Sequence, residues 1–189
     1  MITVNPFFQS FGITNNYIVT DEESRDAILI DCTDVDMAMI DFIEDGKYRL
    51  QGVFLTHAHE HHVSGLLKLQ RIYSVKVFSY LSSVRGVQTV SLAGQERAMC
   101  GTLSVRVLHI PGHSPDSLVY LIGDNVFAGD VKPGAGRTLR HEKDLRLGIE
   151  EKIMSLPDET CIYPGHGPAS TIALEKRFPF FRCVSVPYP

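Results

Sequence analysis

The chain has 189 residues, a formal net charge of −4 at pH 7, 44% hydrophobic residues and 21% charged residues. This composition is typical of a soluble globular protein, and the length fits one domain, residues 1–189. The negative charge disfavours nucleic acid as a partner, and no apolar run approaches the roughly 20 residues that cross a bilayer. We therefore expect neither a nucleic-acid nor a membrane partner.

The N-terminus shows no basic segment followed by an apolar one, and the four cysteines form no C-x-x-C pair. Both features favour a cytoplasmic protein with reduced thiols.

The first third of the chain is predicted to form strands joined by turns. Short apolar runs at 17–19 and 27–30, separated by a polar turn, indicate a hairpin. A helix is expected over 35–43, with Asp34 or Thr33 as its N-cap and Gly46 at its end.

The later elements alternate between strands and helices without a regular period. In chain order we expect a buried strand at 52–55, a helix opening at 65–69, strands at 75–78 and 103–108, a hairpin of 117–121 and 125–127, a helix through 145–153 that ends before Pro157, and a strand at 160–163. This order favours two sheets with outer helices over a doubly wound fold.

Four imidazoles fall within six positions in the segment His57-Ala58-His59-Glu60-His61-His62, and we expect the whole cluster to lie on the loop that leaves the buried strand. Neutral imidazole is a common zinc ligand, and a catalytic zinc takes about three protein ligands plus an open position. His57 and His59 point to the same side of an extended loop, because side chains alternate along it. His113, in a Pro-Gly-His turn, can supply a third imidazole.

Asp130 follows a predicted strand, and its two carboxylate oxygens can bridge two ions. His62 and His166 can then hold a second ion. Each of these residues comes after the end of a strand, which is where a rigid sheet positions binding loops. The sequence thus indicates a metal-dependent hydrolase.

Four motifs occur in the order His-Ala-His-Glu-His-His, Pro-Gly-His-Ser-Pro-Asp-Ser, Phe-Ala-Gly-Asp and Tyr-Pro-Gly-His-Gly-Pro. With the segments 14–17, 30–31 and 134–137 they resemble the metallo-β-lactamase superfamily, and within it the hydroxyacylglutathione hydrolase (glyoxalase II)-like branch. The resemblance spans roughly residues 10–175, and several motifs in order are far more specific than one.

The resemblance implies an α/β (α+β) fold, a four-layer αβ/βα sandwich with the metals at one edge. It implies a first metal on His57, His59 and His113, a catalytic bridge at Asp130, and a second metal on His62 and His166. Asp31 resembles the outer acid that orients a ligand histidine. Gly134, Gly136 and Arg137 either face the substrate or form a turn with a solvated cation. The expected cofactor is zinc, one ion or two, with iron or manganese as alternatives.

Two features depart from the family pattern. The family has an aspartate where this chain has His61, so a second ion should bind more weakly, in altered geometry or not at all. His61 itself is open as a ligand, a solvent-facing residue or an outer donor, and Glu60 is one position out of register. Glyoxalase II also carries a C-terminal helical domain for glutathione, which is not expected in this chain.

The leading hypothesis is hydrolysis of an acyl bond, in particular a thioester of the hydroxyacylglutathione type, by a metal-activated hydroxide. The expected partner is therefore a small-molecule acyl substrate, and the oligomeric state stays open. A mononuclear iron oxidoreductase similar to the persulfide dioxygenases is the alternative. A lactonase, a phosphodiesterase or a non-enzymatic metal-binding scaffold also fits this fold.

Overall fold

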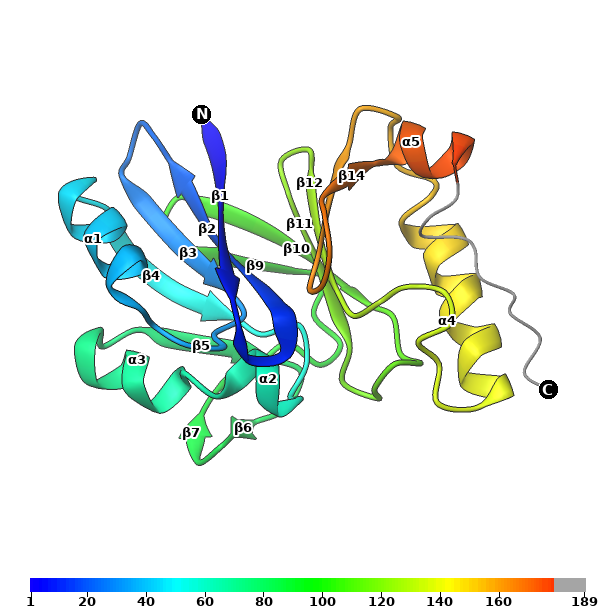
Figure 1. The fold of residues 1–189 in the computed structure, drawn as a ribbon, viewed down its shortest axis with the longest axis horizontal. Helices are drawn as coiled ribbons and strands as arrows, with labels where there is room; N and C mark the ends of the chain where they lie inside the picture. Colours follow the sequence, from blue (N-terminus) through cyan, green and yellow to red (C-terminus); the bar gives the residue numbers. More distant parts are fainter. Residues whose placement is uncertain (179–189) are drawn as a thin grey trace.

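A computed structural model describes residues 1–178 as two mixed sheets with helices on their outer faces (Figure 1). The strands of the first sheet are β1 (Ile2–Gln9), β2 (Thr14–Asp21), β3 (Asp26–Ile30), β4 (Arg49–Phe54), β5 (Lys76–Ser79) and β8 (Val90–Ser91), paired in that order. The second sheet runs in the order β14 (Ser170–Thr171), β13 (Cys161–Pro164), β12 (Asn125–Gly129), β11 (Leu118–Ile122), β10 (Leu103–His109) and β9 (Arg97–Cys100). A small ribbon is formed by β6 (Ser83–Val84) and β7 (Val87–Gln88).

The helices separate into two outer layers, which Figure 1 shows on opposite sides of the paired sheets. The helical segments are η1 (Phe11–Ile13), α1 (Met37–Asp45), α2 (Glu60–Val63), α3 (Leu66–Ile72), α4 (Leu139–Lys152) and α5 (Ile172–Arg177). Residues of α1 and α3 pack on the first sheet, and residues of α4 and α5 pack on the second. The expected four-layer sandwich is confirmed.

Successive side chains of a strand point to opposite faces of the sheet, and this alternation explains why each sheet has a core on both of its faces. In β3, Ile28 and Ile30 enter the core between the two sheets, whereas Ala27 and Leu29 enter the core beneath α1 and α3. Strands that are covered on both faces are apolar throughout, as the sequence shows. The core between the sheets also contains stacked rings, with Phe54 and Phe78 centred 4.4 Å apart.

Parallel pairing brings the ends of several strands to one edge. β3, β4 and β5 run parallel in the first sheet, and β12 and β13 run parallel in the second. Their carboxyl ends are followed by Asp31, His57, Asp130 and His166. The expectation that each metal-type motif follows a strand is therefore confirmed, and the topology gathers those motifs at a common edge.

The N-cap expected for the first helix is wrong. Asp36, two residues after Asp34, caps α1 by accepting a hydrogen bond of 2.9 Å from the amide of Met39. Asp34 instead accepts from Val35 and Lys68, and the Thr33 hydroxyl is used elsewhere. Gly46 ends the helix as expected.

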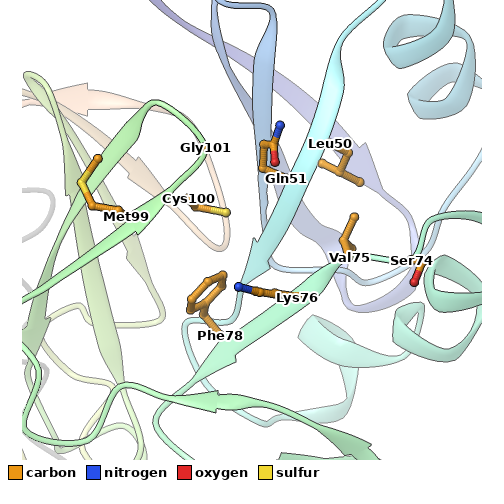
Figure 2. Close-up of a pocket in the computed structure, with 9 residues that line it drawn as sticks. All are labelled: Leu50, Gln51, Ser74, Val75, Lys76, Phe78, Met99, Cys100 and Gly101. Atoms are coloured by element: carbon orange, nitrogen blue, oxygen red, sulfur yellow. The ribbon is translucent and has the colours of Figure 1, made fainter.

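A cavity of about 270 Å³ lies between residues of β4, β5 and β9, and Figure 2 shows the side chains that line it. It opens at the amino ends of β4 and β5, and its lining residues are Leu50, Gln51, Ser74, Val75, Lys76, Phe78, Met99, Cys100 and Gly101. The cysteines at 32, 100 and 161 are free thiols. Within residues 1–178, no helix is both long enough and apolar enough to cross a membrane.

Two leucines of α4 provide a test of the outer core. Leu145 is fully buried against the second sheet, whereas Leu147 is 55% exposed. We expect Leu145→Ala to lower the free energy of unfolding by about 2–5 kcal/mol, because it removes a buried side chain and leaves a cavity. Leu147→Ala should change it by less than about 0.5 kcal/mol. Equal losses for the two variants in denaturant unfolding would contradict this packing.

Candidate metal centre

Seven ligand-type residues converge into two adjacent groups that share one carboxylate. The first group contains His57, His59, His113 and Asp130, and the second contains His61, His62, Asp130 and His166. Within each group, the ligand atoms all lie within 4.8 Å of one another. The fold thus brings together the residues that the sequence predicts as metal ligands.

The first group is built around the Nδ1 atom of His59. His57 Nε2 and His113 Nε2 each lie 2.9 Å from this atom. Asp130 Oδ2 lies 3.3 Å from His113 Nε2 and 3.9 Å from His57 Nε2. The predicted same-side orientation of His57 and His59 is confirmed, and the turn after β10 brings His113 to them.

The second group lies on the other side of Asp130. Asp130 Oδ1 is 3.2 Å from His166 Nε2 and 3.4 Å from His62 Nε2, and Oδ2 is 3.9 Å from His61 Nε2. The expectation that the whole histidine cluster lies on a loop is wrong for His61 and His62, which belong to the single turn α2. That turn places the His61 imidazole in the group, with the side chain 31% exposed, so the geometry favours a ligand or an outer donor over a solvent-facing residue.

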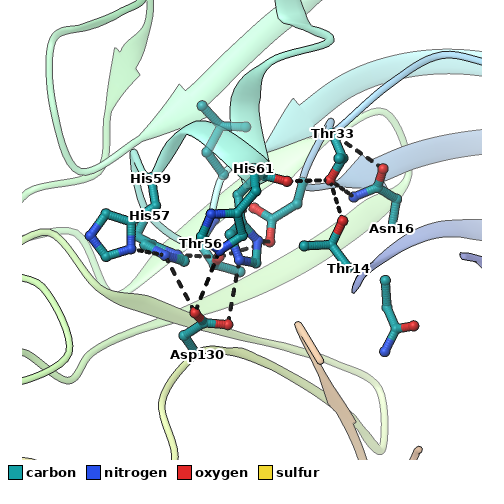
Figure 3. Close-up of polar contacts among 12 residues, drawn as sticks. Thr14, Asn16, Thr33, Thr56, His57, His59, His61 and Asp130 are labelled. Carbon is teal, nitrogen blue, oxygen red and sulfur yellow. Dashed lines mark hydrogen bonds and ion pairs between the residues drawn. The ribbon is translucent and has the colours of Figure 1, made fainter. Parts of the chain in front are cut away.

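Outer hydrogen bonds fix the orientation of two imidazoles (Figure 3). The buried Asp31 carboxylate lies 2.8 Å from His62 Nδ1 and accepts from the Thr56 amide at 2.7 Å and the Thr56 hydroxyl at 2.8 Å. The Thr56 hydroxyl is in turn 3.0 Å from His57 Nδ1. In both histidines Nδ1 is therefore engaged and Nε2 is left to point at Asp130. Asp31 stands where the resemblance placed the outer acid.

A bound cation fits this arrangement. Among the described residues, only two buried side-chain nitrogen or oxygen atoms lack a hydrogen-bond partner, and they are His62 Nε2 and Asp130 Oδ1. Buried polar atoms without partners are costly and call for an explanation. Both belong to the second group, and both can donate a lone pair once His62 Nε2 has given up its proton, so a divalent cation that displaces this proton would satisfy them together.

The pKa values of the imidazoles that would bind such an ion are shifted in different directions. Burial, followed by the charge on His62, lowers the pKa of His57 to about 2 and keeps it neutral. Burial also lowers the pKa values of His59, His61 and His113. For His62 burial acts in the same direction, but the Asp31 carboxylate and then Asp130 outweigh it and raise the pKa to about 10. Burial alone would raise the pKa of Asp130, yet His166 and His62 hold it well below its ordinary value.

The glycine-rich loop 134–137 lies at the rim of the first group. The amides of Gly134 and Gly136 donate to the Glu142 carboxylate at 2.8 and 3.0 Å, and Gly134 has a φ of +85°. Arg137 Nε donates to the His113 carbonyl at 3.0 Å, and its Nη2 contacts His59 Nε2. The Arg137 side chain thus contacts the site, and it is not merely a cation in solvent.

Other polar residues of the motifs lie outside the groups. Glu60 is exposed and pairs with Arg85 at 3.3 Å, as its register predicts. Sequence reasoning missed the buried Thr33, whose hydroxyl donates to the carbonyl of His61 at 2.6 Å. The nearest indication in the sequence was the segment 14–17, which resembles the family but to which the sequence alone assigned no function.

Comparisons with known proteins agree with this geometry. The family profile described as the Metallo-beta-lactamase superfamily matches residues 10–166. A hydroxyacylglutathione hydrolase of Bartonella tribocorum is 29% identical over 163 residues, which are 83% of this chain and 62% of that protein. The chain therefore spans about 62% of the length of this curated relative.

Two solved structures show the same fold. The BLEG-1 B3 metallo-beta-lactamase is 26% identical with a TM-score of 0.79, and the match covers 97% of this chain and 100% of that one. ETHE1 from Myxococcus xanthus is 31% identical with a TM-score of 0.78, over 93% of this chain and 82% of that one. Both the resemblance inferred from the motifs and the predicted fold are confirmed.

Proton release gives a test of the second group. Because the pKa of His62 is raised to about 10, His62 is protonated at neutral pH, and an ion that binds its Nε2 must displace a proton. We expect binding of the second ion to release about one proton and its affinity to rise by up to about tenfold per pH unit below pH 10. Calorimetric titration with zinc in two buffers of different ionisation enthalpy measures this release. An affinity that does not change between pH 6 and 8 would contradict it.

Proposed function

Because the chain belongs to the metallo-beta-lactamase superfamily, we propose that it is a metal-dependent hydrolase of an acyl bond, with a thioester of the hydroxyacylglutathione type as its substrate. The observation that carries this proposal is the Asp130 carboxylate, which is shared by two groups of imidazoles. The name of the Bartonella tribocorum relative supports the thioester as substrate. We further propose that the enzyme is cytoplasmic, with a small molecule as its partner.

The two groups would hold the metal. His57, His59, His113 and Asp130 suit one ion, and the second group suits another. Imidazole with carboxylate is a donor set for zinc, and also for iron or manganese. A divalent ion bound there supplies an activated water at neutral pH and polarises a carbonyl oxygen.

The residues of the chain perform the positioning. Asp130, 7% exposed, can accept a hydrogen bond from a nucleophilic water and orient it toward the carbonyl. Asp31 and Thr56 hold His62 and His57 in one orientation, which keeps the ligand set preorganised. Arg137 places a cation beside the first group, where it can attract an anionic substrate.

The leaving group is consistent with the residues at the site. Alkyl thiols ionise at a pKa of about 8.5, so a thiolate can depart from a thioester without a strong acid. His57, His59 and His113 have lowered pKa values and are poor proton donors at neutral pH. The pKa values of His62 and His166 are raised, but an ion bound at their Nε2 atoms would displace those protons. A thioester therefore suits this site better than an amide, whose nitrogen must be protonated as it leaves.

A second candidate is a mononuclear iron oxidoreductase of the persulfide dioxygenase type. It is favoured by His61, a neutral imidazole where the family has an acid that offsets the charge of a second ion. The first group alone already offers three imidazoles and a carboxylate. Metal analysis of the purified protein separates the candidates. One iron per chain with oxygen consumption supports the oxidoreductase, and two zinc ions with thiol release support the hydrolase.

Removal of the shared carboxylate tests the hydrolase directly. Asp130→Ala should reduce thiol release from S-lactoylglutathione below detection, because both groups lose their common oxygen donor. Asp124→Ala, at an exposed acid in the turn between β11 and β12, is the matched control and should retain full turnover. If the zinc-loaded wild-type protein releases no thiol, the thioester assignment is wrong.

The departure at position 61 can be reversed. His61→Asp should tighten binding of the second ion at least about tenfold, since a unit charge at about 4 Å contributes on the order of 1–4 kcal/mol. Competition with a chromophoric zinc chelator measures the affinity. His141→Asp, at an exposed histidine of α4, makes the same change of charge outside both groups and should leave the affinity unchanged. An unchanged second affinity in His61→Asp would refute this account of the position.

A further inference from the structure

The segment from Gly12 to Asn16, at the start of β2, offers no metal ligand, yet it contacts both sides of the second group. A Cβ on Gly12, whose φ is +69°, would lie 2.5 Å from His61 Cβ. The carbonyl of Ile13 lies 2.8 Å from His166 Nδ1. In Figure 3, Thr14, Asn16 and Thr33 form a polar cluster next to His61, on the side away from Asp130.

Thr33 links this segment to the turn that carries two of the imidazoles. Helix α2 has four residues, so the carbonyls of His61 and His62 have no partner within the helix. The Thr33 hydroxyl donates to the His61 carbonyl at 2.6 Å, and the Cys32 amide donates to the His62 carbonyl at 2.7 Å. The loop after β3 thereby completes the helix end and sets where both imidazoles point.

Thr33 is itself held from β2. Asn16 Nδ2 donates to the Thr33 hydroxyl at 3.1 Å, and the Thr33 amide donates to Asn16 Oδ1 at 3.1 Å. The Thr14 hydroxyl lies 2.8 Å from the Thr33 hydroxyl. The Thr33 proton points at a carbonyl, which can only accept, so the Thr33 oxygen is free to accept from Asn16. All three side chains are buried, so their hydrogen bonds are shielded from water.

Asn15 holds the backbone around His166, which follows a strand of the other sheet. Its Nδ2 donates to the carbonyl of Pro164 at 3.1 Å and to that of Gly167 at 2.8 Å. Its amide donates to the carbonyl of Gly165 at 2.8 Å. Asn15 thus binds the backbone before and after His166 across about 150 residues of sequence.

We propose that Thr33 and Asn15 are positioning residues for the second metal ion, with Thr33 fixing the turn that carries His61 and His62, and Asn15 fixing the loop that carries His166. The proposal rests on the second group being a metal site, as the proposed function requires. It goes further, because it states that residues which would not themselves bind an ion determine how tightly the second site holds one. The first group receives none of these contacts, so the two ions should respond differently.

The test compares two buried threonines. Thr33→Val removes the hydroxyl but keeps the side-chain shape, and should weaken binding of the second zinc ion about 10- to 100-fold while the first is unchanged. Thr33→Ser, which keeps the hydroxyl, should restore binding. Thr20→Val is the matched control, because Thr20 is equally buried on β2 but donates only to Glu22 at 2.8 Å. It should leave both affinities at the wild-type value.

A second pair of variants guards against a folding defect in Thr33→Val. Asn15 is half-buried, and Asn15→Ala should weaken the second ion in the same way. Asn125→Ala is the control, since Asn125 is also half-buried and donates to the carbonyl of Ile122 at 3.2 Å, away from the site. Thermal unfolding of every metal-free variant separates a general loss of stability from a selective loss of the second ion.

The outcomes separate this proposal from the proposed function. A wild-type protein that binds two ions, while Thr33→Val and Asn15→Ala bind both as tightly, overturns the positioning roles and leaves the hydrolase intact. A wild-type protein that binds only one ion also overturns the positioning roles, because there is then no second ion for Thr33 and Asn15 to position. A wild type that binds no metal overturns both proposals. Selective loss of the second ion in both variants, with both controls unchanged, supports the positioning roles.

Discussion

The site depends on one buried carboxylate. Asp130 is 7% exposed and remains ionised, because the imidazoles around it hold its pKa well below the ordinary value. A buried charge is strongly destabilising unless it is compensated, so moving the surrounding segments away from Asp130 would cost free energy. His57, His113, His62 and His166 reach it from three separate segments of the chain. The same carboxylate that would bind metal therefore also fixes the loops that carry the ligands.

The arrangement of hydrogen bonds around the site extends this constraint outward. Asp31, at the end of β3, holds His62 directly and His57 through Thr56. Asn15, at the start of β2, reaches the backbone on either side of His166. The first sheet thus positions ligands that lie on both sheets. Parallel strand ends, outer hydrogen bonds and the shared carboxylate all converge at this edge, which favours a preorganised site.

His61, which stands where the family has an aspartate, packs against Gly12 from a distant part of the chain. An imidazole is longer than the carboxylate that the family carries at this place. Gly12 lies directly against it, and any side chain on Gly12 would collide with the His61 Cβ. Gly12 therefore leaves room for the His61 side chain, and among the described residues Asp130 is the only carboxylate in either ligand group. This low count of acidic ligands is the reason that we keep a mononuclear centre beside the dinuclear hydrolase as a proposal.

Local pattern in the sequence was sufficient for strands β2 to β5 and β10 to β13, but not for β1, β9 or the two-residue strands. It was also sufficient for the same-side pairing of His57 and His59 and, through the order of the motifs, for the family and for the residues that meet in the two groups. Each of these follows from the periodicity of nearby residues or from spacing along the chain. The tertiary structure alone decided that His61 and His62 lie on a helical turn and that Arg137 touches His59. An isolated four-residue helix has no stability of its own, because the first turn is costly to form. It exists because Thr33 and Cys32, about 30 residues earlier, satisfy its carbonyls, and such long-range contacts leave no period in the sequence.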